Sequence, residues 1–165
     1  MKFNYYGFKA IYVHEMNRFY RTVGQSLLSP VISTSLYFVV FGSVIGGYIQ
    51  KIDGVSYGSY IVPGLLMLTL LTQSISNTSF GIFFPKFNGT INEILAAPIS
   101  TLETVLAFVG AGATKTLIVG AVIYATASFF AEVTVEYPML MIFLLILVSF
   151  TFALFGFLIG VVSKN

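Results

Sequence analysis

Side chains that could carry out chemistry are few in this sequence and widely separated. His14 is the only histidine and cysteine is absent, which excludes a histidine metal cluster, a thiolate site and a disulfide. No lysine follows a glycine, so the Gly-Lys-Ser/Thr loop that binds the phosphates of ATP is absent. Apart from scattered tyrosines, Lys115 is the only ionisable residue within the long apolar stretches. We therefore expect neither an enzyme nor a cofactor bound by this chain.

The composition is that of a membrane protein. Hydrophobic residues make up 57% of the 165 residues, charged residues only 8%, and the mean hydropathy is +0.93. A soluble domain carries about 25% charged residues, so this chain cannot cover a surface that faces water. The net charge of +2 comes without the basic cluster that follows a phosphate backbone, so nucleic acid is not an expected partner.

Four apolar stretches are each long enough to cross a bilayer as a helix, which takes about 20 residues. We place these spans at about 25–48, 58–80, 102–130 and 138–162. Basic residues orient them, because Lys and Arg collect on the cytoplasmic side. One side holds Lys2, Lys9, Arg18, Arg21, Lys86 and Lys164, and the other holds Lys51 with Asp53, Glu132 and Glu136. Both ends of the chain are therefore predicted to be cytoplasmic.

The N-terminal segment, about 3–21, has the pattern of an amphipathic helix lying in the cytoplasmic interface of the membrane. Its apolar face is formed by Tyr5, Phe8, Ile11, Tyr12, Met16 and Phe19, and most of its basic residues, Arg18 among them, lie on the other face. Glu15 projects near the centre of the apolar face, where a carboxylate is out of place. We expect it either to find a basic side chain or a helix N-terminus, or to sit at a shallow, wet interface.

Lys115 lies 12 residues beyond Glu103, which is about 18 Å along a helix. A lysine at that depth costs about 2.5–3.5 kcal/mol of insertion free energy, which the apolar residues of the same span offset. Two interpretations stay open. The lysine snorkels toward the cytoplasmic headgroups, or it faces a polar cavity or a partner subunit.

A short polar-flanked segment, about 83–98, separates the second and third spans on the cytoplasmic side. Gly89 and Thr90 lead into a predicted small helix that carries Glu93, Ile94 and Leu95, and Pro98 ends it. A connection between two spans need only be a turn. A helix held at the membrane surface instead suggests an element that passes force to something outside the membrane.

These blocks together resemble the membrane subunit of a type-2 ABC transporter of the exporter-like permease class. Glu15-x-x-Arg18-Phe19 and QSLLSP at 25–30 are similar to the family's interfacial helix and the entry to its first span. LYFVVFG at 36–42 and YIVPG at 60–64 resemble the first and second spans, and the positions of Glu103 and Lys115 also fit. The most specific match is GTINEILAAPIS at 89–100, which resembles the cytoplasmic coupling element.

The resemblance implies a fold and partners. It implies six spans, of which this chain would hold the interfacial helix and the first four, so that Asn165 is expected to mark a truncation. It implies a location in the cell's inner (cytoplasmic) membrane, a second permease subunit, identical or paralogous, and a separate ABC ATPase that binds ATP and Mg²⁺. The implied activity is ATP-driven transport, in the export direction, of an amphiphilic, lipid-linked or drug-like substrate. The alternative function is a multi-pass membrane scaffold without a transport role.

Overall fold

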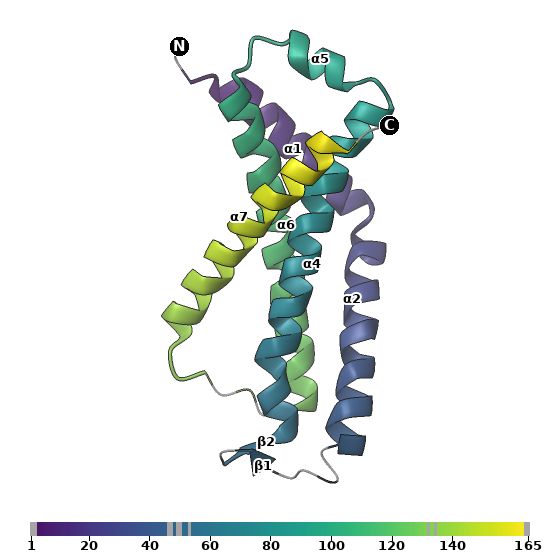
Figure 1. The fold of residues 1–165 in the computed structure, drawn as a ribbon, viewed down its shortest axis with the longest axis vertical. Coiled ribbons are helices and arrows are strands. Elements are labelled where there is room, and N and C mark those ends of the chain that lie inside the picture. Colours follow the sequence, from purple (N-terminus) through teal and green to yellow (C-terminus); the bar gives the residue numbers. More distant parts are fainter. Residues whose placement is uncertain are drawn as a thin grey trace.

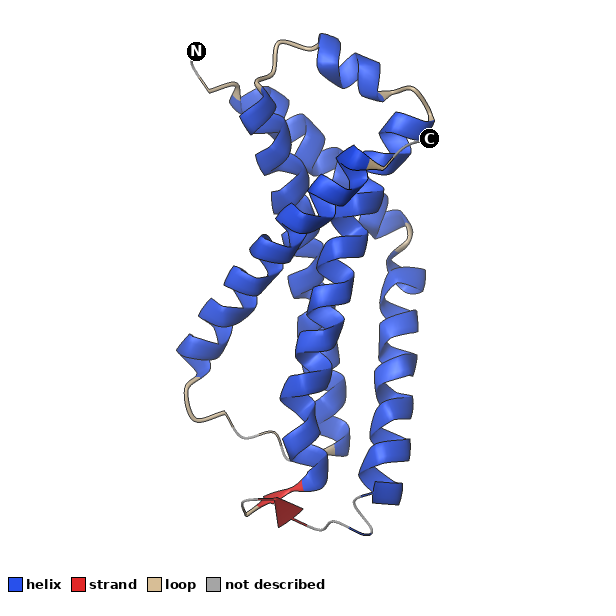
Figure 2. Ribbon diagram, in the orientation of Figure 1, coloured by secondary structure: helices blue, strands red, loops and turns tan. Residues whose placement is uncertain are grey.

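Four long helices form the body of the molecule, with two further helices at one end (Figure 1). The computed structural model describes residues 3–45, 48, 51–52, 54–131, 133 and 135–163. The helices are α1 (Tyr5–Arg21), α2 (Val23–Tyr37), α4 (Tyr57–Phe87), α5 (Ile91–Ala96), α6 (Thr101–Phe130) and α7 (Pro138–Val162). A π-helical segment, η1 (Phe38–Ile45), continues α2, and strands β1 (Lys51–Ile52) and β2 (Val55–Ser56) form a small antiparallel hairpin (Figure 2).

The predicted all-α membrane fold is confirmed. Four helical stretches of the described chain are long and apolar enough to cross a membrane: Val23–Phe41, Tyr57–Phe87, Thr101–Phe130 and Pro138–Val162. Among the described residues, the short hairpin in the connection between the first two spans is the one piece of β structure. Several charges used to orient the spans lie outside the described residues, namely Lys2, Asp53, Glu132 and Lys164, as does Asn165.

The two central helices, α4 and α6, are longer than a bilayer requires. With 31 and 30 residues they extend about 46 Å and 45 Å, whereas the hydrocarbon core is about 30 Å thick. Helices α1 and α5 gather at the same end of the pair, which is also where both ends of the chain lie (Figure 1). The excess length of α4 and α6 therefore serves as a platform for α1 and α5.

Local signals in the sequence account for where several helices begin. Ser100 accepts a hydrogen bond from the Glu103 amide while the Glu103 carboxylate accepts one from the Ser100 amide, a capping box that starts α6. Helix α7 starts at Pro138, whose missing amide hydrogen costs nothing in the first turn. Ser56 caps α4 by accepting from the Ser59 amide.

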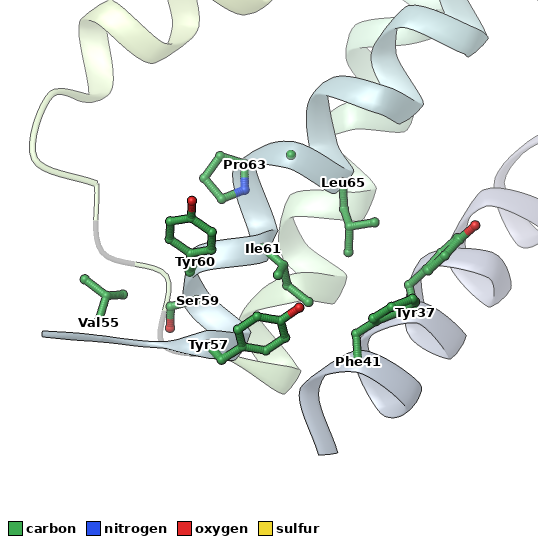
Figure 3. A pocket seen from close by; sticks show the side chains of 10 residues that line it. Tyr37, Phe41, Val55, Tyr57, Ser59, Tyr60, Ile61, Pro63 and Leu65 are labelled. Carbon is green, nitrogen blue, oxygen red and sulfur yellow. The ribbon is translucent and has the colours of Figure 1, made fainter. Parts of the chain in front are cut away.

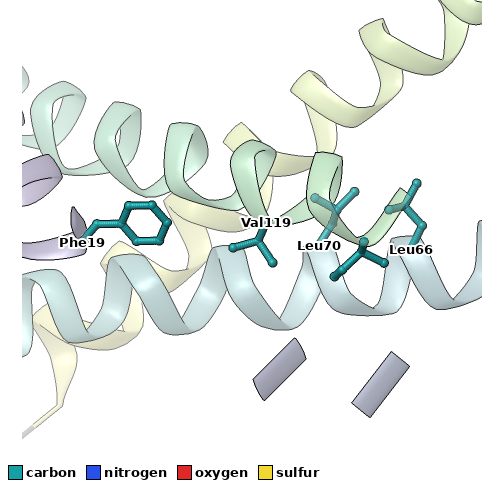
Figure 4. Packing of buried hydrophobic residues seen from close by; sticks show 5 residues of the cluster. Phe19, Leu66, Leu70 and Val119 are labelled. Carbon is teal, nitrogen blue, oxygen red and sulfur yellow. The ribbon is translucent and has the colours of Figure 1, made fainter. Parts of the chain in front are cut away.

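The core lies where α1, α4 and α6 meet. One cluster of buried side chains, shown in Figure 4, consists of Phe19, Leu66, Leu70, Val119 and Ile123. Glycines of α6 let α4 approach closely, because a Cβ on Gly120 would lie only 2.8 Å from a methyl carbon of Leu70. Helix α6 is accordingly the most enclosed of the four long helices, and α2 packs mainly against it.

Helix α7 crosses α4 through a stripe of small residues, Ser149, Ala153, Gly156 and Gly160, all buried. A Cβ on Gly156 would lie 2.5 Å from the Ile75 carbonyl oxygen, so the two backbones are in direct contact there. At the end of α7 the Lys86 ammonium donates hydrogen bonds of 2.7 Å to the carbonyls of Val161 and Ser163. Lys86 thereby bonds carbonyl groups at the C-terminal end of α7, where a helix leaves its last carbonyls without an intrahelical partner.

Candidate functional site

The predicted coupling segment forms a distinct helix outside the bundle. Helix α4 ends at Phe87, Gly89 turns the chain with a φ of 77°, and α5 runs over Ile91–Ala96. A φ in that region is strained for residues with a side chain, which is why glycine occupies this turn. Ala97 is extended, as the residue before a proline prefers, so α5 stops just ahead of Pro98.

The two faces of α5 have different environments. Ile91 and Ile94 are half-buried and pack against a cluster of Ile11, Ile82, Ala107 and Phe108, contributed by α1, α4 and α6. The other coupling residues predicted from the sequence, Gly89, Thr90, Glu93, Leu95 and Pro98, are exposed. Leu95 is 73% exposed and the preceding Phe87 is 67% exposed. We call this outward surface, Phe87 to Pro98 without Ile91 and Ile94, the α5 surface.

A set of hydrogen bonds joins the start of α1 to the end of the coupling segment. The Asn4 amide donates to Glu103 Oε1 at 2.6 Å, and the Asn4 side chain donates to the Pro98 carbonyl at 3.0 Å. The same side chain accepts from the Gly7 amide and so caps α1. The sequence reasoning missed Asn4. Its Asn-x-x-Gly spacing reveals a helix cap, but nothing local indicates the partner 94 residues away.

A buried charge cluster of Glu15, Arg18 and Lys115 fixes the middle of α1 to α6. Glu15 Oε2 lies 2.7 Å from Lys115 Nζ and 2.8 Å from Arg18 Nη2. The side chains of Glu15 and Lys115 are 2% and 4% exposed, and that of Arg18 is 34% exposed. Gly81 of α4 makes room for the cluster, because a Cβ there would lie 3.3 Å from the Glu15 carboxylate.

This geometry tests the alternatives that the sequence left open. The prediction that Glu15 pairs with a basic side chain is confirmed. The alternative, that Glu15 sits at a shallow, wet interface, is wrong because the carboxylate is buried. The Lys115 ammonium neither snorkels to the headgroups nor faces an open cavity, because it is buried against Glu15 of the same chain. Burial of a charge is tolerated only with such a partner. That Lys115 also faces a partner subunit stays a prediction.

Comparison with known proteins identifies the family. Residues 6–165 match the family described as ABC-2 type transporter. The chain belongs to that family. "Inner membrane transport permease YadH" of Escherichia coli (strain K12) and of Shigella flexneri are each 37% identical to this ABC-2 chain over 157 residues, which is 95% of the chain. The match covers 61% of each relative, so the chain spans less than two thirds of their length. No solved structure gives a significant match.

Membership confirms the resemblance drawn from the sequence. The connection between α4 and α6 in this ABC-2 chain carries its own helix, α5. Helix α1 is attached to α6 at two separate places. One attachment is the hydrogen-bonded group around Asn4 and Glu103, and the other is the charge cluster. The described residues hold no group of three or more histidine or acidic residues that could bind a metal ion.

Proposed function

We propose that this chain forms part of the membrane permease of an ABC transporter, which exports an amphiphilic, lipid-linked or drug-like substrate at the expense of ATP. Family membership and the permease name of the YadH relatives support the transport role. The observation that carries the coupling role is the α5 surface. It exposes the side chains of Phe87, Glu93 and Leu95, while Ile91 and Ile94 on the other side of the helix are anchored in the bundle.

The ATPase partner docks on the α5 surface and binds ATP and Mg²⁺ itself. A helix of only six residues is not stable alone, so α5 keeps its shape through Ile91 and Ile94. A push on α5 therefore reaches the side chains of α1, α4 and α6 against which those residues pack. In this arrangement the chain acts with a second permease subunit in the inner membrane, with both of its ends on the cytoplasmic side.

Glu93 supplies the charged contact of the docking surface. It is exposed in the first turn of α5 and makes no ion pair with the described residues. A carboxylate in that position is available to a basic side chain of the ATPase. Some close charge pairs across protein interfaces contribute about 1.5–7 kcal/mol of coupling free energy, and the lower end of that range already corresponds to about tenfold in affinity.

The experiment compares Glu93→Lys with the matched control Asn92→Lys in the intact transporter. Asn92 is the exposed neighbour on the same helix, so the control adds a lysine without removing the carboxylate. We expect Glu93→Lys to insert into the membrane normally, to lose ATP-driven efflux of a fluorescent amphiphile, and to co-purify with at least tenfold less ATPase. Asn92→Lys should retain most of both. Normal efflux by Glu93→Lys would refute the coupling role.

A further inference from the structure

A polar groove lies between α2 and α4, within the part of the molecule that crosses the membrane. Its volume is about 270 Å³. Seven of its ten lining residues carry a hydroxyl or an amide, and none is acidic or basic. The polar ones are Ser29, Ser33, Thr34, Tyr37, Thr69, Thr72 and Gln73, and the others are Pro30, Leu65 and Leu68. We call this the α2–α4 groove.

The groove lies deep in the spans rather than at their ends. Ser29 is six residues beyond the start of α2, about 9 Å along the helix, and Gln73 is 16 residues into α4, about 24 Å. A pocket on the opposite side of α4, lined by α4, α6 and α7, is formed by Leu, Ala, Gly, Met and Ile side chains and a single tyrosine. The lining of the α2–α4 groove is therefore more polar than that of this neighbouring pocket.

Several groove side chains retain hydrogen-bonding capacity. Thr69 and Thr72 donate to carbonyls of their own helix, at 2.8 and 2.9 Å, which leaves their oxygens able to accept. Gln73 Oε1 accepts from Asn77 at 3.4 Å, so its amide N–H groups remain available. Ser29 and Ser33 make no side-chain hydrogen bond within the described part of the chain. Hydrocarbon cannot satisfy such groups, whose desolvation is costly.

The groove adjoins an aromatic pocket of about 790 Å³, because Tyr37 and Leu65 line both. Figure 3 shows Tyr37 and Phe41 on one side of this pocket and Tyr57, Ile61 and Leu65 of α4 on the other. The two cavities together offer a hydrogen-bonding section followed by a large apolar section. An amphiphile has the same two parts.

We propose that the α2–α4 groove binds the uncharged polar part of an amphiphile that carries hydroxyl or amide groups, with the apolar part in the aromatic pocket. This substrate class rests on the proposed transport function. Glycoside-like or amide headgroups match the donors and acceptors of the groove. A phosphate or an ammonium does not, because no opposite charge lines the groove and an unpaired ion at that depth is strongly disfavoured.

The test is photolabelling of the intact protein in membrane vesicles with three probes of equal alkyl length, each carrying a diazirine next to the headgroup. The headgroups are glucoside, phosphate and trimethylammonium. We expect the glucoside probe to label residues of α2 and α4 around the groove at least tenfold more than the other two, and unlabelled alkyl glucoside to compete. Equal labelling by all three probes would overturn the proposal.

A matched pair of variants separates the groove from the rest of the surface. Thr72→Val removes a groove hydroxyl, and Thr151→Val removes a hydroxyl of α7 that also donates to its own helix and is also exposed. Glucoside labelling should fall severalfold in Thr72→Val and further in Thr72→Val with Gln73→Leu, and should not change in Thr151→Val. Unchanged labelling in the groove variants contradicts the proposal.

A second copy of the chain could occupy the groove instead of a ligand. Disulfide cross-linking through an introduced cysteine distinguishes the two occupants. These 165 residues contain no cysteine, so Thr72→Cys places the one thiol of this part of the protein in the groove. Efficient oxidative cross-linking of Thr72→Cys into a dimer would assign the groove to a subunit interface and overturn ligand binding. The labelling requires neither ATP nor the ATPase, so its failure leaves the Glu93 test of the transport function unaffected, and the reverse also holds.

Discussion

Replacing Glu15 with glutamine removes the shared anion of the charge cluster and preserves the size of the side chain. Both cations contact the same oxygen, Glu15 Oε2, at 2.7 Å from Lys115 and 2.8 Å from Arg18. Arg18 is one third exposed and can turn to water, whereas the side chain of Lys115 is only 4% exposed. The variant therefore leaves a buried ammonium without an anionic partner among the described residues. Such a change lowers the free energy of unfolding by about 3–5 kcal/mol.

Substitutions of the other members of the cluster should give a graded series of losses in the free energy of unfolding. Lys115→Met leaves Glu15 paired with Arg18, so the loss is that of one charged hydrogen bond, about 1.5–3 kcal/mol. Arg18→Met removes the more exposed partner and should cost less than about 1 kcal/mol. The double variant Glu15→Gln with Lys115→Met removes both buried charges, and should be less destabilised than Glu15→Gln alone. The resulting cycle should give a coupling free energy of at least about 1.5 kcal/mol.

Equilibrium unfolding in mixed micelles, by titration with sodium dodecyl sulfate, measures these differences. Far-ultraviolet circular dichroism is the suitable signal, because the fold is helical and the chain has no tryptophan for a fluorescence assay. The reasoning is refuted if Glu15→Gln costs no more than Arg18→Met. It is refuted equally if the double variant loses the sum of the two single losses, since independent sites would behave in that way.

Two further predictions concern packing and the attachment of α1. Gly156→Ala places a methyl group 2.5 Å from the Ile75 carbonyl oxygen, so α7 must shift away from α4. We expect the free energy of unfolding to fall by about 1–3 kcal/mol in the same assay. The control Gly64→Ala, where nothing lies within 4 Å of the added methyl group, should not lower it. Asn4→Ala removes the α1 cap and the bond to Pro98, and should cost about 1 kcal/mol. Hydrogen exchange of the backbone amides measures this loss: exchange should become faster in the first turn of α1 in the Asn4→Ala variant. Unchanged exchange would contradict the attachment of α1 through Asn4.

Local and periodic features of this protein were readable from the sequence, and contacts between distant residues were not. The four spans follow from the length of apolar stretches, and the small helix before Pro98 follows from its flanking turn residues. The pairing of Glu15 with Lys115 joins residues 100 positions apart, and neither position carries a local sign of the other. Glu15 was recognisable only as a carboxylate on an apolar face, a conflict that a tertiary contact resolves.

The α2–α4 groove escaped the sequence reasoning for a related reason. Serines and threonines in a membrane helix bond to their own backbone and give no directional signal, as Thr69 and Thr72 do here. Their significance comes from α2, which packs mainly on α6 and leaves its serines opposite the polar side of α4. Composition does not indicate which sides of two helices face each other.

We expect the two attachments of α1 to make it move with α6, which would link the proposed docking surface on α5 to the groove. Asn4 holds the start of α1 at Pro98 and Glu103, and the charge cluster holds its middle. A displacement of α5 is therefore expected to carry α1 with it. Helix α2 begins immediately after α1, and Thr22 alone separates them. If the ATPase pushes on α5, the change of angle is taken up at Thr22 and alters the distance between α2 and α4. Transport then requires that the groove bind its ligand with different affinity in the two positions, because only a difference of affinity couples binding to the movement.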